Sequence, residues 1–192
     1  ASLGKRMSAY LIDLIILLII LGLIGLLYKP DVTSLTAQMD NITLKYANGD
    51  ISFTSYMTDL SFIYKQIDTI NIFLNLINVL YIIAYFVILP YLNHGQTIGK
   101  KLMNIEVKAR SNQSLSLTSL LIRNLIINGL LYFVTVIICC LIIPDNIYFT
   151  VITILGLIQL TLLFISIIMT LTRRDKRGLH DILAGTWVAT TK

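Results

Sequence analysis

Long runs of hydrophobic residues alternate with polar segments along this chain. Four runs reach the roughly 20 residues that a helix needs to cross about 30 Å of hydrocarbon. They cover residues 7–28, 70–89, 120–143 and 147–171, and only the first and the third contain a charged residue. Helices are required there because the bilayer interior offers no water to unpaired backbone groups. The pattern therefore predicts an all-α integral membrane protein with a bundle of four transmembrane helices.

Three polar segments join or follow these helices in what we treat as a single domain. In residues 29–69, apolar residues recur at helical spacing from Phe53 onward, which predicts an amphipathic helix or an ordinary surface-packed helix. In residues 90–119, apolar and charged residues alternate over Ile105–Ala109, a pattern typical of a short strand. Residues 172–192 form a tail. We expect an outer segment, a structured inner loop and a cytoplasmic tail.

Composition supports this class, and charge predicts the orientation. Hydrophobic residues make up 56% of the 192 residues and charged residues 13%, against roughly 45–50% and 25% in soluble domains. Lys and Arg gather in the amino-terminal flank, in residues 90–119 and in the tail, whereas aspartates dominate residues 29–69. The positive-inside rule then places both termini in the cytoplasm, with basic residues near anionic lipid headgroups. The net charge of +5 reflects this topology, so no nucleic-acid partner is expected.

Asp13 is the most informative residue, because an aspartate at the centre of a membrane helix costs roughly 2.5–3.5 kcal/mol. Arg6, Tyr10 and Asp13 share one helix face. Such a carboxylate either handles ions or protons, or forms a structural ion pair, and both alternatives stay open. Arg123 is expected to pair with a buried carboxylate or to reach the inner headgroups. The first run is too long for a secretory signal and contains an aspartate, so we expect a retained helix.

Further polar side chains recur along the other three predicted helices. Where their faces converge, they form either hydrogen-bonded contacts between helices or a polar pathway through the membrane. These residues are Asn71, Asn75, Asn78, Asn124, Asn128, Gln159, Ser166 and Thr170. The two histidines are far apart in the sequence, and the motifs of common hydrolases are absent. The sequence thus predicts no metal, no cofactor and no enzymatic activity.

Four short motifs, in a fixed order, resemble the RDD family of bacterial membrane proteins. They are Arg6-x-x-Ala9-x-x-Ile12-Asp13, Gly95-Gln96-Thr97-Ile98-Gly99-Lys100, Leu121-Ile122-Arg123-Asn124, and Arg177-Gly178-Leu179-His180-Asp181-Ile182-Leu183-Ala184-Gly185-Thr186-Trp187-Val188. The resemblance assigns the arginine and the two aspartates of the family name to Arg6, Asp13 and Asp181, with Asp175 as the alternative second aspartate. It implies a multi-pass bacterial cell-membrane protein and suggests transport, which in some members exchanges monovalent cations for protons.

Two functional hypotheses follow. In the first, the chain is a secondary transporter, expected to be a homodimer, in which Arg6, Asp13, Arg123 and Asp181 form one ion or ion-pair cluster. Gly178 and Gly185 would let the tail fold back, so that Arg6 bridges the two aspartates. This arrangement either serves ion exchange or only fixes the tail to the helices electrostatically. In the second, the chain is a membrane interaction, assembly or immunity protein. It binds a partner through its polar helix faces and through its outer segment, and this segment departs from the family pattern.

Overall fold

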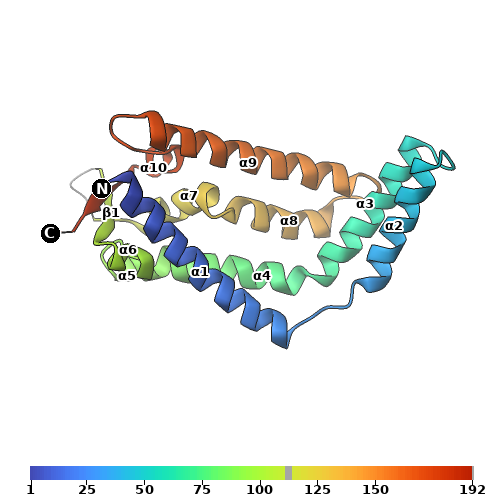
Figure 1. Ribbon diagram of the computed structural model, residues 1–192, viewed down its shortest axis with the longest axis horizontal. Coiled ribbons are helices and arrows are strands. Elements are labelled where there is room, and N and C mark those ends of the chain that lie inside the picture. Colours follow the sequence, from blue (N-terminus) through green and yellow to red (C-terminus); the bar gives the residue numbers. More distant parts are fainter. Residues whose placement is uncertain (111–113, 192) are drawn as a thin grey trace. The chain divides into compact units, whose positions relative to one another are not determined.

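The computed structural model describes residues 1–110 and 114–191, and most of its regular structure is helical (Figure 1). Its elements are α1 (Leu3–Leu27), α2 (Thr33–Ala47), α3 (Phe53–Ile70), α4 (Ile72–Tyr81), the π-helix η1 (Ile82–Ile88), α5 (Leu89–Leu92), α6 (Ile98–Leu102), β1 (Ile105–Ala109), α7 (Leu117–Ile127), α8 (Leu130–Ile142), the 3₁₀ turn η2 (Asp145–Ile147), α9 (Tyr148–Thr172), α10 (Leu179–Leu183) and β2 (Thr186–Thr190). Within these residues, three helical stretches are long and apolar enough to cross a membrane, and the α7–α8 pair makes a fourth if it counts as one span. These helices confirm the prediction of an integral membrane protein.

The third hydrophobic run is broken, whereas its sequence predicts one helix over residues 120–143. α7 and α8 are bent by 79° at the break between them. Asn128 ends α7, and Gly129 follows with a φ of +68°. Glycine adopts this left-handed conformation without the strain that a side chain would add, so the Asn-Gly pair ends the first helical half.

The second span changes its helical form toward its carboxyl end. Pro90 has no backbone N–H, so it cannot donate to the carbonyl of Phe86 one helical turn earlier. The carbonyl oxygen of Phe86 instead accepts a hydrogen bond from Nδ2 of Asn124, at 2.9 Å. The π-helix η1 lies immediately before this point. Asn124 therefore supports an interruption of the second span as well as contacting its own helix.

The described chain folds into two compact units, which we consider separately. The first comprises Ala1–Tyr28, Val79–Leu131 and Gln159–Lys192, and the second comprises Lys29–Asn78 and Tyr132–Ile158. In the second unit, α3 confirms the helix expected from Phe53 onward. The helix α2 was not expected, because its sequence is polar. In the structure, Leu35 is its only buried residue.

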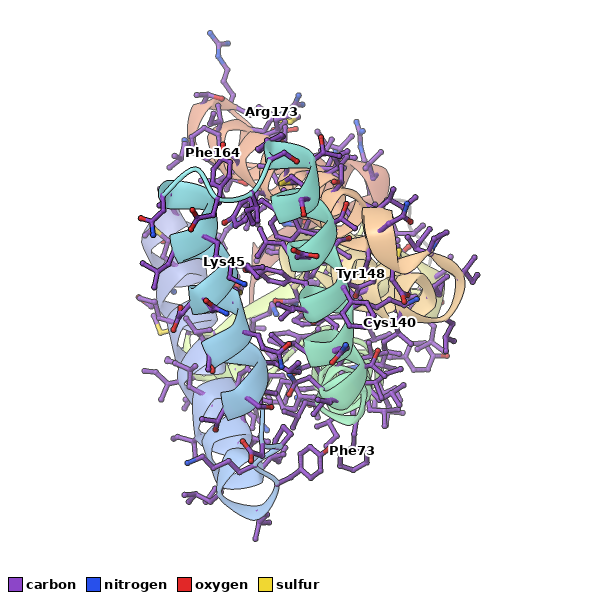
Figure 2. All side chains as sticks on the ribbon, turned by 90° about the vertical axis from the view of Figure 1, so that its right-hand side faces the viewer. Lys45, Phe73, Cys140, Tyr148, Phe164 and Arg173 are labelled. Atoms are coloured by element: carbon purple, nitrogen blue, oxygen red, sulfur yellow. The ribbon has the colours of Figure 1, made fainter. Side chains whose placement is uncertain are left out.

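Hydrogen bonds between distant segments organise the core of the second unit. The hydroxyl group of Tyr148, which is fully buried, donates to Asp68 at 2.8 Å. It also lies 3.1 Å from the sulfur of Cys140, and Figure 2 labels both residues. Nζ of Lys65 contacts the carboxylate of Asp145 at 2.5 Å. These contacts join α3 to α8 and to the start of α9, so the expected outer segment is a packed structure.

A small antiparallel sheet covers part of the first unit. β1 confirms the predicted strand, and it pairs with β2, from Ile105 opposite Thr190 to Ala109 opposite Thr186. β2 was not expected, so the all-α prediction holds for the membrane segments and needs this correction in the loop and tail. Ile105, Val107 and Val188 are buried together with Ala9 of α1. The sheet thus connects the inner loop and the tail to the start of the first helix, near both chain ends (Figure 1).

Candidate functional site

Asp13 lies almost completely buried in a cradle of hydrogen-bond donors within the first unit. Its Oδ1 accepts a hydrogen bond from the Tyr85 hydroxyl at 2.6 Å and one from the backbone N–H of Gly99 at 2.8 Å. Its Oδ2 accepts a hydrogen bond from the Thr97 hydroxyl at 2.6 Å. Nζ of Lys100 lies 4.0 Å from the same oxygen. A buried charge is tolerated only when it is paired and hydrogen-bonded, and this cradle supplies both conditions.

The motif Gly95–Lys100 builds most of this cradle. Thr97 is the N-cap of α6, so the first turn of this helix presents the N–H of Gly99 toward the carboxylate. A Cβ atom on Gly99 would lie 2.2 Å from the carbonyl oxygen of Ala9 and 2.8 Å from Oδ1 of Asp13. Only glycine allows α6 to approach α1 this closely. The motif that supports the family resemblance is therefore the part of the inner loop that receives the membrane aspartate.

Lys100 balances the negative charge of Asp13. Its side chain is 16% exposed, and its ammonium group also donates to the Thr97 hydroxyl at 3.2 Å. Burial is the largest influence and lowers the pKa of Lys100 to about 8; the positive charge of Arg123 acts in the same direction, while Asp13 and Asp181 oppose both. The charge of this lysine is therefore sensitive to changes of pH just above neutrality.

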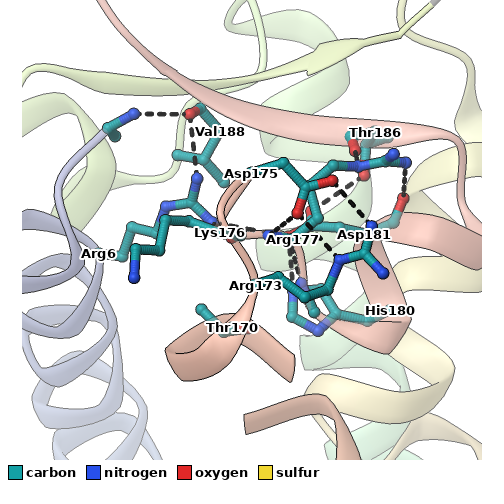
Figure 3. Close-up of polar contacts among 12 residues, drawn as sticks. Arg6, Thr170, Arg173, Asp175, Lys176, Arg177, His180, Asp181, Thr186 and Val188 are labelled. Atoms are coloured by element: carbon teal, nitrogen blue, oxygen red, sulfur yellow. Dashed lines mark hydrogen bonds and ion pairs between the residues drawn. The ribbon is translucent and has the colours of Figure 1, made fainter. Parts of the chain in front are cut away.

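Asp181 forms a second buried cluster in the same unit. Its Oδ1 contacts a guanidinium nitrogen of Arg123 and accepts a hydrogen bond from the Thr186 hydroxyl at 3.2 Å. Nε2 of His180 lies 3.3 Å from its Oδ2, and Nη1 of Arg6 lies 3.8 Å from the same atom (Figure 3). Burial alone would raise the pKa of Asp181, but Arg123, His180 and Arg6 together hold it well below its usual value.

His180 connects this cluster to α9. Its Nδ1 lies 2.5 Å from the hydroxyl oxygen of Ser166. Burial and the positive charge of Arg123 lower the pKa of His180, so the imidazole is neutral at pH 7. In the neutral tautomer with Nε2–H directed to Asp181, Nδ1 accepts a hydrogen bond from the Ser166 hydroxyl. The tail is thereby held against the end of the fourth hydrophobic span.

Arg6 binds the tail and makes no contact with Asp13. It donates hydrogen bonds to the carbonyl oxygens of Lys176 and Val188 (Figure 3). Of the four residues expected in one cluster, the structure therefore brings Arg6, Arg123 and Asp181 together and places Asp13 with other partners. The physical reason is distance along α1: seven residues separate Arg6 from Asp13, a rise of about 10 Å. Asp175, the alternative second aspartate, is exposed and pairs with Arg173 at 2.9 Å.

The other polar residues of the first unit bind neighbouring backbone or one another. Nδ2 of Asn128 donates to Oδ1 of Asn124 at 2.5 Å, and Nε2 of Gln159 donates to the carbonyl oxygen of Ile126 at 2.7 Å. The Thr170 hydroxyl donates to the carbonyl oxygen of Ser166 within α9. Of these three contacts, the one from Gln159 to Ile126 joins α9 to α7, and the other two lie within α9 or at the end of α7.

The remaining candidates are three asparagines of the second unit and Tyr10. Asn71, Asn75 and Asn78 belong to the second unit and are half-buried. The amide of Asn71 donates to the carbonyl oxygen of Ile67 in the preceding turn. Tyr10 is 40% exposed. The structure leaves these four residues outside both carboxylate clusters.

Sequence reasoning missed several partners of the two aspartates: Tyr85, Thr97, Gly99, Lys100, Arg177 and Thr186. The Gly95–Lys100 motif was visible, but spacing alone does not show that it receives a residue more than 80 positions earlier. Within residues 1–110 and 114–191, no group of three or more His, Cys, Asp or Glu side chains is placed to hold a metal ion.

A cavity of about 420 Å³ lies inside the first unit, between α1, the end of the second span, α7, α9 and the sheet of β1 and β2. Most of its lining is apolar. Its polar side chains include Arg6, Asp13, Lys100, Arg123 and His180. The cavity therefore reaches both the Asp13–Lys100 pair and the basic side of the Asp181 cluster.

Comparison with known proteins agrees with the sequence motifs. The model of the RDD family matches residues 1–185. The uncharacterized protein YckC of Bacillus subtilis (strain 168) is 32% identical over 109 residues, which cover 57% of this chain and 56% of that protein. The chain thus aligns with little more than half the length of this relative. No solved structure matches.

Proposed function

This chain belongs to the RDD family, and we propose that it is a secondary transporter that exchanges a monovalent cation for a proton at the Asp13–Lys100 pair. One observation carries the proposal: a buried carboxylate and an ammonium group 4.0 Å from it both line one cavity. Ionisable residues in membrane helices commonly mark ion or proton pathways. The site is proposed to bind and release ions, without enzymatic chemistry.

The proposed exchange conserves charge at the site. When Lys100 is protonated, its ammonium group neutralises Asp13, and no further cation is needed. When Lys100 releases its proton, the carboxylate is left with one negative charge, which a monovalent cation can neutralise. Oxygen atoms of Asp13, Thr97 and Tyr85 lie together and are suitable ligands for a hard cation. One cation thus replaces one proton.

The pKa of Lys100 supports this scheme. A lysine with its ordinary pKa of 10.5 would remain protonated across the physiological range, whereas here burial, helped by Arg123, lowers the pKa to about 8. Rising pH removes the competing proton near that value. We therefore expect the rate of exchange to depend on pH between pH 7 and pH 9.

Contacts within the first unit support four membrane crossings with both termini on one side. Side chains near the start of α1 bind the residues after α9, and Arg123 near the start of α7 binds the tail. Asp13 binds the loop after the second span. Because the residues before α1 and after α9 lie on the same side, the chain crosses the membrane an even number of times. This requires α7 and α8 to form one crossing together. The positive-inside rule makes that side cytoplasmic, and a bacterial relative supports a bacterial cell membrane as the location.

Proton flux in proteoliposomes tests the exchange. Purified protein is reconstituted with a pH-sensitive dye inside, and a sodium or potassium gradient is then applied. Asp13→Asn is expected to reduce the cation-dependent proton flux at least tenfold, because the site loses the charge that binds the cation. Asp175→Asn is the matched control, since this exposed aspartate lies outside the site, and it should retain the wild-type flux.

The same assay separates the role of Lys100 from that of general positive charge. Lys100→Arg keeps the charge but cannot release a proton in this pH range, so flux should be lost from pH 6 to pH 9. Lys101→Arg changes the exposed neighbour and should preserve both the rate and its pH dependence. Wild-type flux in Asp13→Asn, or an unchanged pH profile in Lys100→Arg, would exclude the mechanism.

A further inference from the structure

The cavity of the first unit opens toward the region expected to hold lipid. Several of its lining residues belong to α1 and α9, two helices long and apolar enough to span a membrane. Met7 and Leu11 are 56% and 53% exposed, and Ile167 and Leu171 are both 48% exposed. A residue that lines a cavity and remains half-exposed on a membrane helix lies at its lateral opening. A ligand can therefore enter from the bilayer.

Charge inside this unit is unbalanced. Of the charged side chains, Arg6, Lys100, Arg123 and Asp13 line the cavity, and Asp181 contacts Arg123. At pH 7 Lys100 is protonated and His180 is neutral, so these three cations and two carboxylates leave one positive charge in excess. Buried charges in proteins are normally paired. An anion is therefore the complementary ligand.

Glu106 does not correct this imbalance. Ile105 and Val107 of β1 are buried and line the cavity, and the alternation of a strand directs Glu106 to the opposite face. There it pairs with Lys108 at 2.8 Å. The exposed Asp175 likewise pairs with Arg173. The charged groups nearest the cavity thus remain predominantly positive.

Arg6 has one N–H donor without an acceptor among the described residues. Its two terminal nitrogens bind carbonyl oxygens of the tail. Its Nε is buried and has no hydrogen-bond partner within residues 1–110 and 114–191. Arg6 also lines the cavity, together with apolar residues on either side of it along α1. A guanidinium group at the basic end of an apolar cavity suits a phosphate that is attached to a hydrocarbon chain.

From these observations we infer that the cavity binds an anionic phospholipid of the surrounding membrane, with one acyl chain inside and its phosphate beside Arg6. The volume of about 420 Å³ falls within the roughly 300–1,000 Å³ of sites that enclose small ligands. The excess positive charge selects an anionic over a zwitterionic headgroup. The phospholipid would occupy the same cavity as the cation of the proposed exchange, so the two ligands would compete for it. Binding of the phospholipid does not depend on that exchange.

Native mass spectrometry of the full chain in neutral detergent tests the inference. The protein is titrated with phosphatidylglycerol, with phosphatidylcholine of the same acyl chains, or with inorganic phosphate, and the fraction that carries one ligand is measured. Phosphatidylglycerol should bind at least tenfold more tightly than phosphatidylcholine. Inorganic phosphate should not compete at equal concentration, because it has no chain to fill the apolar part.

Two pairs of variants assign the binding to this cavity. Arg6→Gln should remove the preference for phosphatidylglycerol, whereas Arg174→Gln removes an exposed charge of the tail and should leave it intact. Ile167→Trp should reduce binding of phosphatidylglycerol tenfold by filling the opening without changing any charge. Ile168→Trp alters the next residue of α9, which does not line the cavity, and should bind as the wild type does.

Three results would overturn the inference. Equal affinity for the two phospholipids would show that the buried cations do not select the ligand. Equal losses in Arg6→Gln and Arg174→Gln would indicate general attraction to a basic surface. Wild-type binding in Ile167→Trp would show that the chain lies elsewhere, and this result stays informative even if Arg6→Gln folds poorly.

Discussion

Asp181→Asn is expected to destabilise the protein by roughly 3–5 kcal/mol, which is typical when one partner of a buried ion pair is removed. The variant keeps the shape of the side chain but leaves Arg123 without its carboxylate. It also removes the anion that Arg6 approaches at 3.8 Å. For a chain of this size we expect the thermal unfolding midpoint to fall by about 10 °C or more. Thermal unfolding in detergent measures this change.

The control for this variant is Asp175→Asn. Asp175 is exposed and bonded to Arg173, and such surface pairs contribute about 0–1 kcal/mol, so its midpoint should stay close to the wild-type value. If both variants unfold at the same temperature, Asp181 does not hold the tail.

The response of Asp181 to pH has a definite sign. Its pKa is lower in the folded protein than its ordinary value of 3.8, despite burial, because Arg123, His180 and Arg6 favour the charged form. The stabilisation is therefore complete above about pH 4 and is lost as the pH falls below that value toward the lowered pKa. The wild type should lose stability in this acid range, and Asp181→Asn should lack that component.

Gly99→Ala is expected to separate α6 from α1. The added methyl group would lie 2.2 Å from the carbonyl oxygen of Ala9, a backbone atom that cannot rotate away. The N–H of Gly99 would then lose its bond to Asp13. Overpacking of this kind costs about 1–3 kcal/mol, and a hydrogen bond to a charged group contributes about 1.5–3 kcal/mol. The unfolding midpoint should fall by about 10 °C, and cation-dependent proton flux should be strongly reduced.

Gly22→Ala provides the comparison. Gly22 lies within α1, and a Cβ atom there would meet nothing within 4 Å. Alanine favours the helix over glycine by roughly 0.5–1 kcal/mol, so this variant should be as stable as the wild type or slightly more stable. A Gly99→Ala protein with the same midpoint as Gly22→Ala would show that α6 does not pack against α1 as described.

The length of the apolar runs was sufficient to identify the membrane helices, because a segment in the bilayer must form its backbone hydrogen bonds within itself. α1 and α9 lie within a few residues of their predicted bounds. The break at Asn128–Gly129 was harder to foresee, since a single glycine is tolerated in many helices. The helix α2 was missed because its stability comes from packing on α3, including a stack of Tyr46 on Tyr56 at 4.6 Å, and not from an apolar face.

The two aspartates were recognised from the sequence, but their partners were only partly predicted. A carboxylate in a hydrophobic helix requires compensation, and the nearest arginine in the sequence was the natural candidate. The structure compensates Asp13 with Thr97, Gly99 and Lys100 instead. Contacts over such separations depend on how the inner loop folds, and local spacing carries no information about that.

Double-mutant cycles provide the most direct test of the division into two carboxylate clusters. Unfolding free energies are measured for Asp13→Asn, Lys100→Gln, Arg6→Gln and the double variants that combine Asp13→Asn with each of the others. We predict a coupling of about 1 kcal/mol or more between Asp13 and Lys100, as for groups in contact, and less than about 0.5 kcal/mol between Asp13 and Arg6. A strong coupling of Asp13 to Arg6, with none to Lys100, would contradict the account.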